Sequence, residues 1–126
     1  MFVGVARIVL RLPGARSLKD RRRVVKSYKE RLKARLPVVV AELGDIESYQ
    51  LATLGLCTVS GDVTLCEEVL QKALGMGRSL ADALLIDAAH EVIPFGTRGS
   101  SVQGGLEHAL DASVIADKYQ DEDEDA

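Results

Sequence analysis

The chain has 126 residues, of which 47% are hydrophobic and 28% are charged, and its formal net charge at pH 7 is −3. This length corresponds to a single domain, and the composition is that of an ordinary globular protein rather than of a collagen-like fibre. Two cysteines are too few for a disulfide framework. No apolar run reaches 18 residues, and the first residues lack the pattern of a secretory signal, so we expect a cytoplasmic protein.

The first predicted element is a strand over residues 2–12, in which two sets of residues alternate along the chain. Pro13 and Gly14 end this strand. A helix to about residue 35 should follow, because Ser17 and Asp20 have the spacing of a capping box in which Asp20 accepts a hydrogen bond from the Ser17 amide. The apolar stripe of this helix consists of Leu18, Val25, Tyr28, Leu32 and Leu36.

Two strands, over residues 38–43 and 51–60, are predicted to form a hairpin. Asp62 is a suitable N-cap for a second helix. We expect Gly75 and Gly77 to end this helix, because glycine favours the turn that follows a helix. Its apolar stripe consists of Cys66, Val69, Leu70, Ala73 and Leu74.

Residues 83–93 are predicted to form the last strand, with a helix as the alternative because the alanines weaken the strand pattern. The order β-α-β-β-α-β predicts an α+β, ferredoxin-like domain over residues 1–93. Its four-stranded antiparallel sheet should have the spatial order 4-1-3-2, with both helices on one face. The expected core residues are Phe2, Ile8, Leu10, Val25, Tyr28, Leu32, Leu54, Leu56, Val69 and Leu70.

The remaining segment, residues 94–126, differs in composition. It begins as a Gly/Ser-rich linker, and residues 104–119 could form a short amphipathic helix that must dock elsewhere to be stable. Residues 121–125 are five consecutive acidic residues, which we expect to be disordered. We further expect this tail to compete with nucleic acid for the basic part of the chain.

The basic residues are unevenly distributed. Residues 7–35 hold twelve of the 16 basic residues and only two acidic ones, a net charge of +10 against −13 elsewhere. A solubilising helix normally mixes in acidic partners, so this one favours contact with phosphates or with another acidic partner over a merely solvated surface. The scarcity of aromatic residues argues against base-specific readout. The expected contact residues are Arg16, Lys19, Arg21, Arg22, Arg23, Lys26 and Lys29.

The face of the sheet away from the helices carries two further features. Arg7 and Arg11 have the same spacing as Asp87 and Glu91, so cross-strand ion pairs are expected, with an arginine-lined binding site as the alternative. Apolar residues also lie on this face, which suggests that a second subunit or residues 104–119 cover it. These apolar residues are Val5, Val9, Val39 and Cys57.

Signals for catalysis or metal binding are weak. The loop over residues 44–50 carries Asp45, Glu47 and Tyr49, and its two carboxylates could hold a cation or act in acid–base chemistry, but a polar turn is the simpler interpretation. Glu42, near this loop at the end of the preceding strand, is the one further residue that supports a site there. Neither the cysteines nor the histidines, His90 and His108, have the spacing of zinc ligands. We therefore expect no catalytic residue, no metal and no cofactor. A small-molecule enzyme or ligand sensor built on this loop remains the third hypothesis.

Three stretches of residues resemble the YlxP-like bacterial family of small ferredoxin-like proteins: 11–22 (RLPGARSLKDRR), 40–43 (VAEL) and 49–55 (YQLATLG). The similarity extends over about residues 1–93. The family has no established biochemical activity, and its members are often encoded beside factors for translation initiation and ribosome maturation. The resemblance and the charge together predict a non-enzymatic accessory protein that contacts ribosomal RNA or a ribonucleoprotein. The alternative is a homo-oligomeric interaction module, a homodimer through the open sheet face, with no nucleic-acid role.

Overall fold

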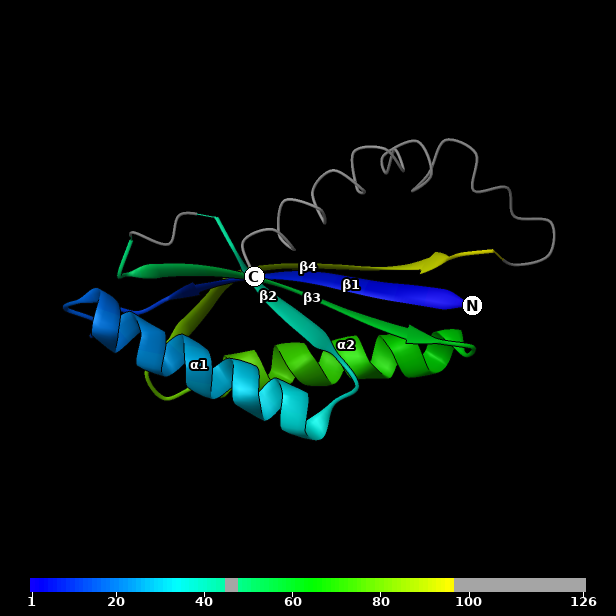
Figure 1. Cartoon of the computed structure of the whole chain (residues 1–126), viewed down its shortest axis with the longest axis horizontal. Coiled ribbons are helices and arrows are strands. Elements are labelled where there is room, and N and C mark those ends of the chain that lie inside the picture. The colour runs from blue at the N-terminus through cyan, green and yellow to red at the C-terminus, as the bar shows by residue number, and fades with distance from the viewer. Residues whose placement is uncertain (45–47, 97–126) are drawn as a thin grey trace, which may run out of the picture. The chain divides into compact units, whose positions relative to one another are not determined.

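The computed structural model describes residues 1–44 and 48–96, and Met1–Pro94 form one compact unit (Figure 1). The six elements of this unit follow the predicted order. They are β1 (Phe2–Arg11), α1 (Leu18–Arg35), β2 (Val39–Leu43), β3 (Leu51–Ser60), α2 (Val63–Arg78) and β4 (Leu84–Pro94). The last segment is thus a strand, as predicted, and not the alternative helix.

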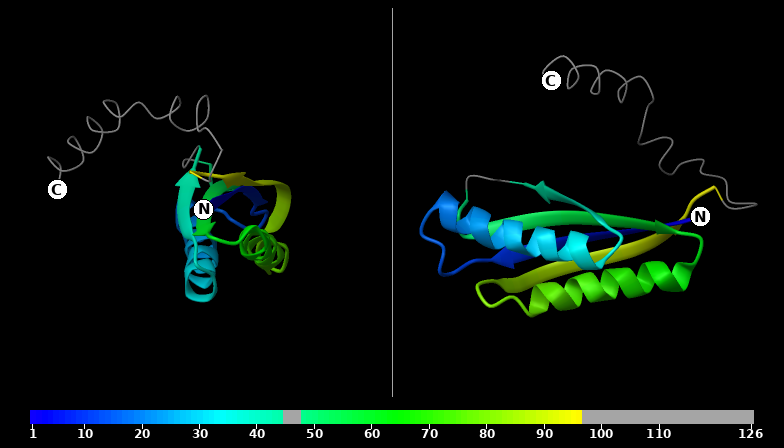
Figure 2. Two further views of the ribbon diagram at one scale, coloured as in Figure 1. Left: turned by 90° about the vertical axis from the view of Figure 1, so that its right-hand side faces the viewer. Right: turned by 60° about the horizontal axis from the view of Figure 1, so that its bottom comes forward.

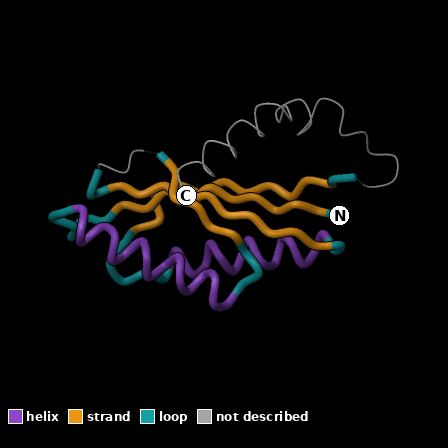
Figure 3. The backbone as a smooth tube through the Cα atoms, in the orientation of Figure 1, coloured by secondary structure: helices purple, strands orange, loops and turns teal. Residues whose placement is uncertain are grey.

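The four strands form one antiparallel sheet in the order β2-β3-β1-β4, which confirms the predicted ferredoxin-like topology. Figure 3 distinguishes the strands from the two helices by colour. Both helices cover the same face of the sheet, as the end-on view shows (Figure 2). The register between β1 and β4 shifts after Val9, where Ile86 is left without a partner on β1. Such a bulge increases the local twist of an edge strand.

The core lies between the sheet and the helices. Alternate residues of β1, from Gly4 to Leu10, point into it, because side chains of a strand alternate between its two faces. Leu54 and Leu56 of β3 and Tyr28 and Leu32 of α1 complete its centre. Eight of the ten predicted core residues are buried, whereas Phe2 and Val69 are only half-buried at the margin.

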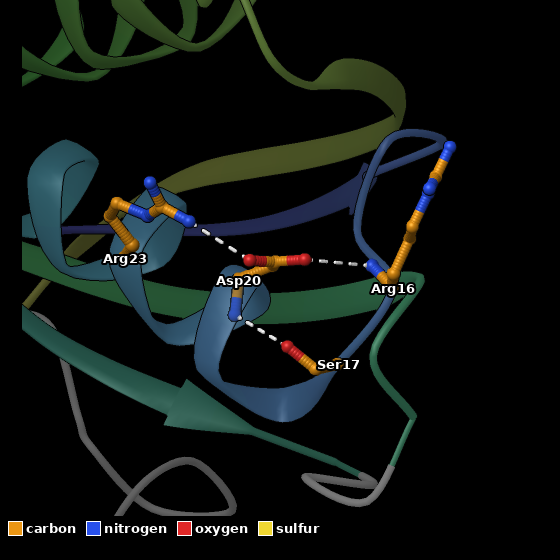
Figure 4. A network of polar contacts seen from close by, with 4 residues as sticks. All are labelled: Arg16, Ser17, Asp20 and Arg23. Carbon is orange, nitrogen blue, oxygen red and sulfur yellow. Dashed lines mark hydrogen bonds and ion pairs between the residues drawn. The ribbon is translucent and has the colours of Figure 1, made fainter.

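The start of α1 departs from the predicted capping box in one bond. The Ser17 hydroxyl accepts a hydrogen bond from the Asp20 amide at 3.2 Å, as expected of an N-cap. The Asp20 carboxylate, however, accepts from the amide of Arg16 at 3.0 Å and not from that of Ser17. It therefore fixes the loop one residue before the cap (Figure 4).

The second helix is longer than predicted. Asp62 caps it as expected, with its carboxylate accepting from the Thr64 amide at 2.8 Å. Gly75 and Gly77 do not end the helix, which continues to Arg78. The close approach of Tyr28 explains Gly77, because a Cβ atom there would lie 2.9 Å from the Tyr28 hydroxyl oxygen.

The other face of the sheet is not covered by either helix (Figure 2). Its residues form rows across the strands; in one such row Val39, Cys57, Val5 and Glu91 are register partners. Neither helix of the described residues is both long and apolar enough to cross a bilayer. The expectations for residues 97–126, namely the linker, the helix over 104–119 and the acidic tail, lie outside the described residues.

Candidate nucleic-acid interface

The basic residues of α1 fall on distinct sides of the helix. At 100° per residue, Arg21, Val25, Tyr28 and Leu32 share one side, and all four are buried. A second set, spaced three and four residues apart, occupies a neighbouring flank within an arc of about 80°. We call this set the cationic stripe; it consists of Lys19, Arg22, Lys26, Lys29 and Lys33.

The cationic stripe is accessible and nearly free of acidic neighbours. Four of its side chains are exposed and Lys29 is half-buried. Within residues 1–44 and 48–96, its one ion pair joins Lys26 to Glu30 at 3.9 Å, between two side chains that are both largely exposed. Such an exposed pair is weak, and a phosphate group can replace the carboxylate. The stripe thus presents five positive charges over about 21 Å of helix.

Arg21 corrects the sequence prediction. Its side chain is only 2% exposed, so it cannot reach a phosphate in solution. Its guanidinium forms an ion pair with Glu42 of β2, and its Nε donates to the carbonyl of Leu51 on β3 at 3.1 Å. Arg21 therefore joins α1 to two strands of the sheet, because a buried cation is tolerated only when it is paired and hydrogen-bonded.

A signal for this role was present in the sequence. Position 21 precedes Val25, Tyr28 and Leu32 by four, seven and eleven residues, which is the spacing of the buried stripe. Charge alone does not distinguish Arg21 from its exposed neighbours. Its partner Glu42 is one of the residues on which the hypothesis of an enzyme or ligand sensor rests, and this ion pair engages its carboxylate.

Arg16 and Arg23 lie outside the cationic stripe, at the start of α1. Arg23 donates from Nη2 to the Asp20 carboxylate at 2.9 Å, and both arginine side chains are exposed (Figure 4). The hydrogen bond from the Arg16 amide and the bonds with Arg23 and Ser17 hold the pKa of Asp20 below its usual value. Arg16 itself has no acidic partner within the described residues. Both residues remain accessible, but Arg23 is already engaged by a carboxylate.

The remaining chemistry-bearing residues are structural or isolated. Cys66 is buried and Cys57 half-buried, and neither forms a disulfide. His90 contacts Glu67 of α2 at 3.6 Å at the surface. No group of three or more potential metal ligands occurs in the part of the chain that the structure describes. Two members of the candidate catalytic loop, Asp45 and Glu47, lie outside that part.

On the open sheet face, Arg7 forms an ion pair with Asp87 at 3.2 Å, diagonally across β1 and β4. This bond is one of the cross-strand pairs expected from the sequence. No corresponding pair involves Arg11 or Glu91 within the described residues. Because both side chains of the Arg7–Asp87 pair are more than half exposed, the pair contributes little stability.

Solved structures with a similar backbone fold have low sequence identity to this chain. The designed protein Foldit4 is 13% identical, with 75% of this chain and 99% of that chain covered and a TM-score of 0.47. A mutant of SnoaB, a cofactor-independent oxygenase from Streptomyces nogalater, is 12% identical, with 79% and 98% covered and a TM-score of 0.44. The designed ferredoxin-fold protein LFR1 1 is 10% identical, with 81% and 93% covered and a TM-score of 0.43.

Comparison with the curated proteins gives no match. The family model for DUF503, a protein family of unknown function, matches residues 3–90. These residues include the four elements from α1 to α2 in full, β1 except for its first residue, and most of β4. The match includes the whole of α1 with its cationic stripe and the buried Arg21. The chain therefore belongs to the DUF503 family.

Proposed function

We propose that this protein is a non-enzymatic accessory protein that binds structured RNA, on its own or in a ribonucleoprotein such as the ribosome, through the cationic stripe. The observation that carries the proposal is the arrangement of Lys19, Arg22, Lys26, Lys29 and Lys33 on one flank of a rigid helix. Fixed cations on one line neutralise successive phosphates and release the counterions condensed on the nucleic acid.

The geometry favours recognition of backbone shape over recognition of sequence. The stripe contains lysine and arginine only, and no aromatic residue accompanies it on α1 except Tyr28, which is fully buried. Stacking on aromatic side chains is the usual way in which proteins read unpaired bases. The YlxP-like resemblance, with its members encoded beside translation factors, supports RNA as the nucleic acid.

The test is the salt dependence of binding to a fluorescent RNA duplex. If all five cations of the stripe contact phosphates, log Kd should rise with log salt with a slope of about 3.5 to 4.5. Lys19→Glu with Arg22→Glu should weaken binding strongly and reduce the slope. The matched control is Lys72→Glu with Arg78→Glu, which makes the same charge change on exposed residues of α2.

Equal losses in both double variants would show that net charge, and not the stripe, governs binding, and would contradict the proposal. An affinity that is unchanged between low and moderate salt would contradict it as well. In cell lysate, the protein should sediment with ribosomal particles in a sucrose gradient and be released by high salt. The stripe variant should remain at the top of the gradient at either salt concentration.

A second candidate function rests on the open sheet face. Val39 and Val59 are 69% and 61% exposed there, on the neighbouring strands β2 and β3, and they add to an apolar surface with Val5 and Cys57. The charges of the four ionic residues on this face sum to zero, so net repulsion does not oppose contact between two copies; these residues are Arg7, Arg11, Asp87 and Glu91. The face measures roughly 600 Å² from strand spacing and rise, close to the share of one partner in a stable interface.

A second copy of the chain is therefore the partner that this face fits, and the two functions are compatible. Light scattering at tens of micromolar should give the mass of a dimer. Val59→Glu should convert it to a monomer without unfolding, whereas Val63→Glu, at an exposed valine on α2, should not. A monomeric wild-type protein would exclude this interaction.

A further inference from the structure

A cavity of about 800 Å³ lies on the flank of α1 opposite the cationic stripe. Its walls are residues 12–15 after β1, one side of α1, and residues 79–84, which run from the end of α2 to the first residue of β4. The third segment is far from the first two in the sequence. This volume falls within the range of sites that hold small molecules and cofactors. The first wall belongs to the motif RLPGARSLKDRR, most of which the cationic stripe does not explain.

The α1 wall of the cavity has a regular cationic pattern. Arg23, Ser27 and Arg31 line it at intervals of four residues, so two guanidinium groups flank a hydroxyl along one line of the helix. Arg31 has no acidic partner within residues 1–44 and 48–96. Asp20 also lines this wall, and its carboxylate pairs with Arg23, so among the described residues Arg31 is the arginine of the wall that is free to bind an anion. The planar guanidinium group is suited to bidentate binding of phosphate.

The opposite wall differs in chemistry. Leu80, Ala83 and Leu84 provide apolar surface, and Asp82 provides a carboxylate that has no cationic partner in the described part of the chain. A carboxylate accepts hydrogen bonds from an exocyclic amino group of a base, as in the recognition of cytosine. A purely anionic ligand, or one without an apolar part, would match only one of the two walls.

We propose that this cavity binds a nucleoside 5′-phosphate, with the phosphate at Arg31 and an amino-bearing base against Leu80 and Asp82. The site goes beyond the RNA binding proposed above, because it needs neither the cationic stripe nor a continuous strand. The nucleotide can come free in solution or as one unpaired nucleotide of an RNA strand. Both sources present the same phosphate and base to the cavity.

The test uses the full chain and titrates it with CMP, AMP, GMP, UMP and inorganic phosphate, with amide chemical shifts as the readout. We expect shifts at Ser27 and at residues 79–84, with the three amino-bearing nucleotides bound more tightly than UMP. Arg31→Glu should weaken binding by about tenfold or more. Arg35→Glu makes the same charge change one turn further along, outside the cavity, and should bind almost as wild type.

Two further variants separate the parts of the site. Ser27→Trp, an exposed helical position, should fill the cavity and abolish binding without a change of charge. Asp82→Asn should reduce the preference for CMP over UMP. A short unpaired oligonucleotide distinguishes the two sources of the nucleotide. If the natural ligand is an RNA strand, the oligonucleotide should bind more tightly than CMP, and Arg31→Glu should weaken its binding. If the natural ligand is a free nucleotide, the oligonucleotide should bind no more tightly than CMP.

Several outcomes would overturn the proposal. These are the absence of binding by any nucleotide at millimolar concentration, binding of inorganic phosphate as tight as that of CMP, and full binding by Arg31→Glu. The result is separable from the proposed RNA function. Lys19→Glu with Arg22→Glu should leave nucleotide binding in the cavity intact, and Arg31→Glu should weaken duplex RNA no more than Arg35→Glu does.

Discussion

The hydroxyl of Tyr28 in α1 donates a hydrogen bond of 2.8 Å to the carbonyl of Ala73 in α2. This bond is the polar contact at the centre of the helix–helix packing, and the tyrosine ring around it is fully buried. It fixes how closely the two helices approach, and therefore where α1 presents its cationic stripe and where the cavity opens.

The Tyr28 contact predicts an alkaline transition. Burial raises the pKa of Tyr28 to about 12 from its usual value of 10. The unfolded chain therefore releases this proton first as the pH rises, so the free energy of unfolding should fall between pH 10 and about 12. Tyr28→Phe should cost about 1 kcal/mol at neutral pH and should lack this alkaline component. Denaturant unfolding of both proteins across this pH range gives the difference directly.

The two glycines of α2 should respond oppositely to alanine. Nothing lies within 4 Å of a Cβ atom at Gly75, so Gly75→Ala should raise the free energy of unfolding by up to about 1 kcal/mol through helix propensity. At Gly77 the new methyl group would meet the Tyr28 hydroxyl oxygen at 2.9 Å and Leu85 at 3.1 Å. Gly77→Ala should therefore destabilise the protein by about 1–3 kcal/mol.

A double-mutant cycle checks this explanation of Gly77. Removal of the hydroxyl in Tyr28→Phe also removes the closest contact, so Gly77→Ala should cost less in that background than in wild type. Equal costs in the two backgrounds would show that Tyr28 is not the reason for glycine at this position. Thermal or denaturant unfolding of the four proteins is sufficient.

The Asp20 carboxylate should stabilise the start of α1 when it is ionised, and this stabilisation should be lost in acid. The hydrogen bond from the Arg16 amide, followed by the contacts with Arg23 and Ser17, keeps the pKa of Asp20 below its usual value of 3.8. The unfolded chain takes up this proton first on acidification, so the stabilisation is present above about pH 4 and is lost as the pH falls through the lowered pKa. Asp20→Asn should reduce Tm at neutral pH. It should also make the decrease of Tm on acidification smaller than in wild type. Asp82→Asn, at an exposed carboxylate, is the control and should change neither.

The topology could be predicted from the sequence because each element carries a local signal, whereas several contacts between elements could not. Alternation in β1 and the stripe of α1 indicate a strand and a helix, and the order of all six elements, with right-handed crossovers, indicates the sheet order. The sequence predicts a helix end at Gly77, because the tertiary contact with Tyr28 that explains this glycine leaves no local signal. The cavity was not foreseen, since its walls come together only when residues 12–15 and 79–84 meet beside α1.

The acidic C-terminal residues should weaken RNA binding through their charge alone. Residues 117–126 contain six acidic residues and one basic residue, so their removal changes the formal net charge from −3 to +2. Because the electrostatic attraction of a polyanion depends on the field of the whole protein, the truncated chain should bind duplex RNA more tightly at low salt. The difference should vanish at high salt, where charges are screened. An unchanged affinity at low salt would remove any role for this segment in binding.

The neighbouring residues Arg21 and Arg22 should separate stability from binding. Arg21→Met leaves the partly buried Glu42 carboxylate without its partner and should reduce the free energy of unfolding by about 2–3 kcal/mol. The additional change Glu42→Leu should recover much of this loss, because apolar residues can replace a buried ion pair. Arg22→Met removes an exposed member of the cationic stripe, so it should weaken duplex RNA binding with little effect on stability. Unfolding and RNA titration of both single variants, measured below the transition temperature of Arg21→Met, form the test. If Arg21→Met weakened RNA binding as much as Arg22→Met did while remaining folded, the assignment of the two arginines to opposite roles would be wrong.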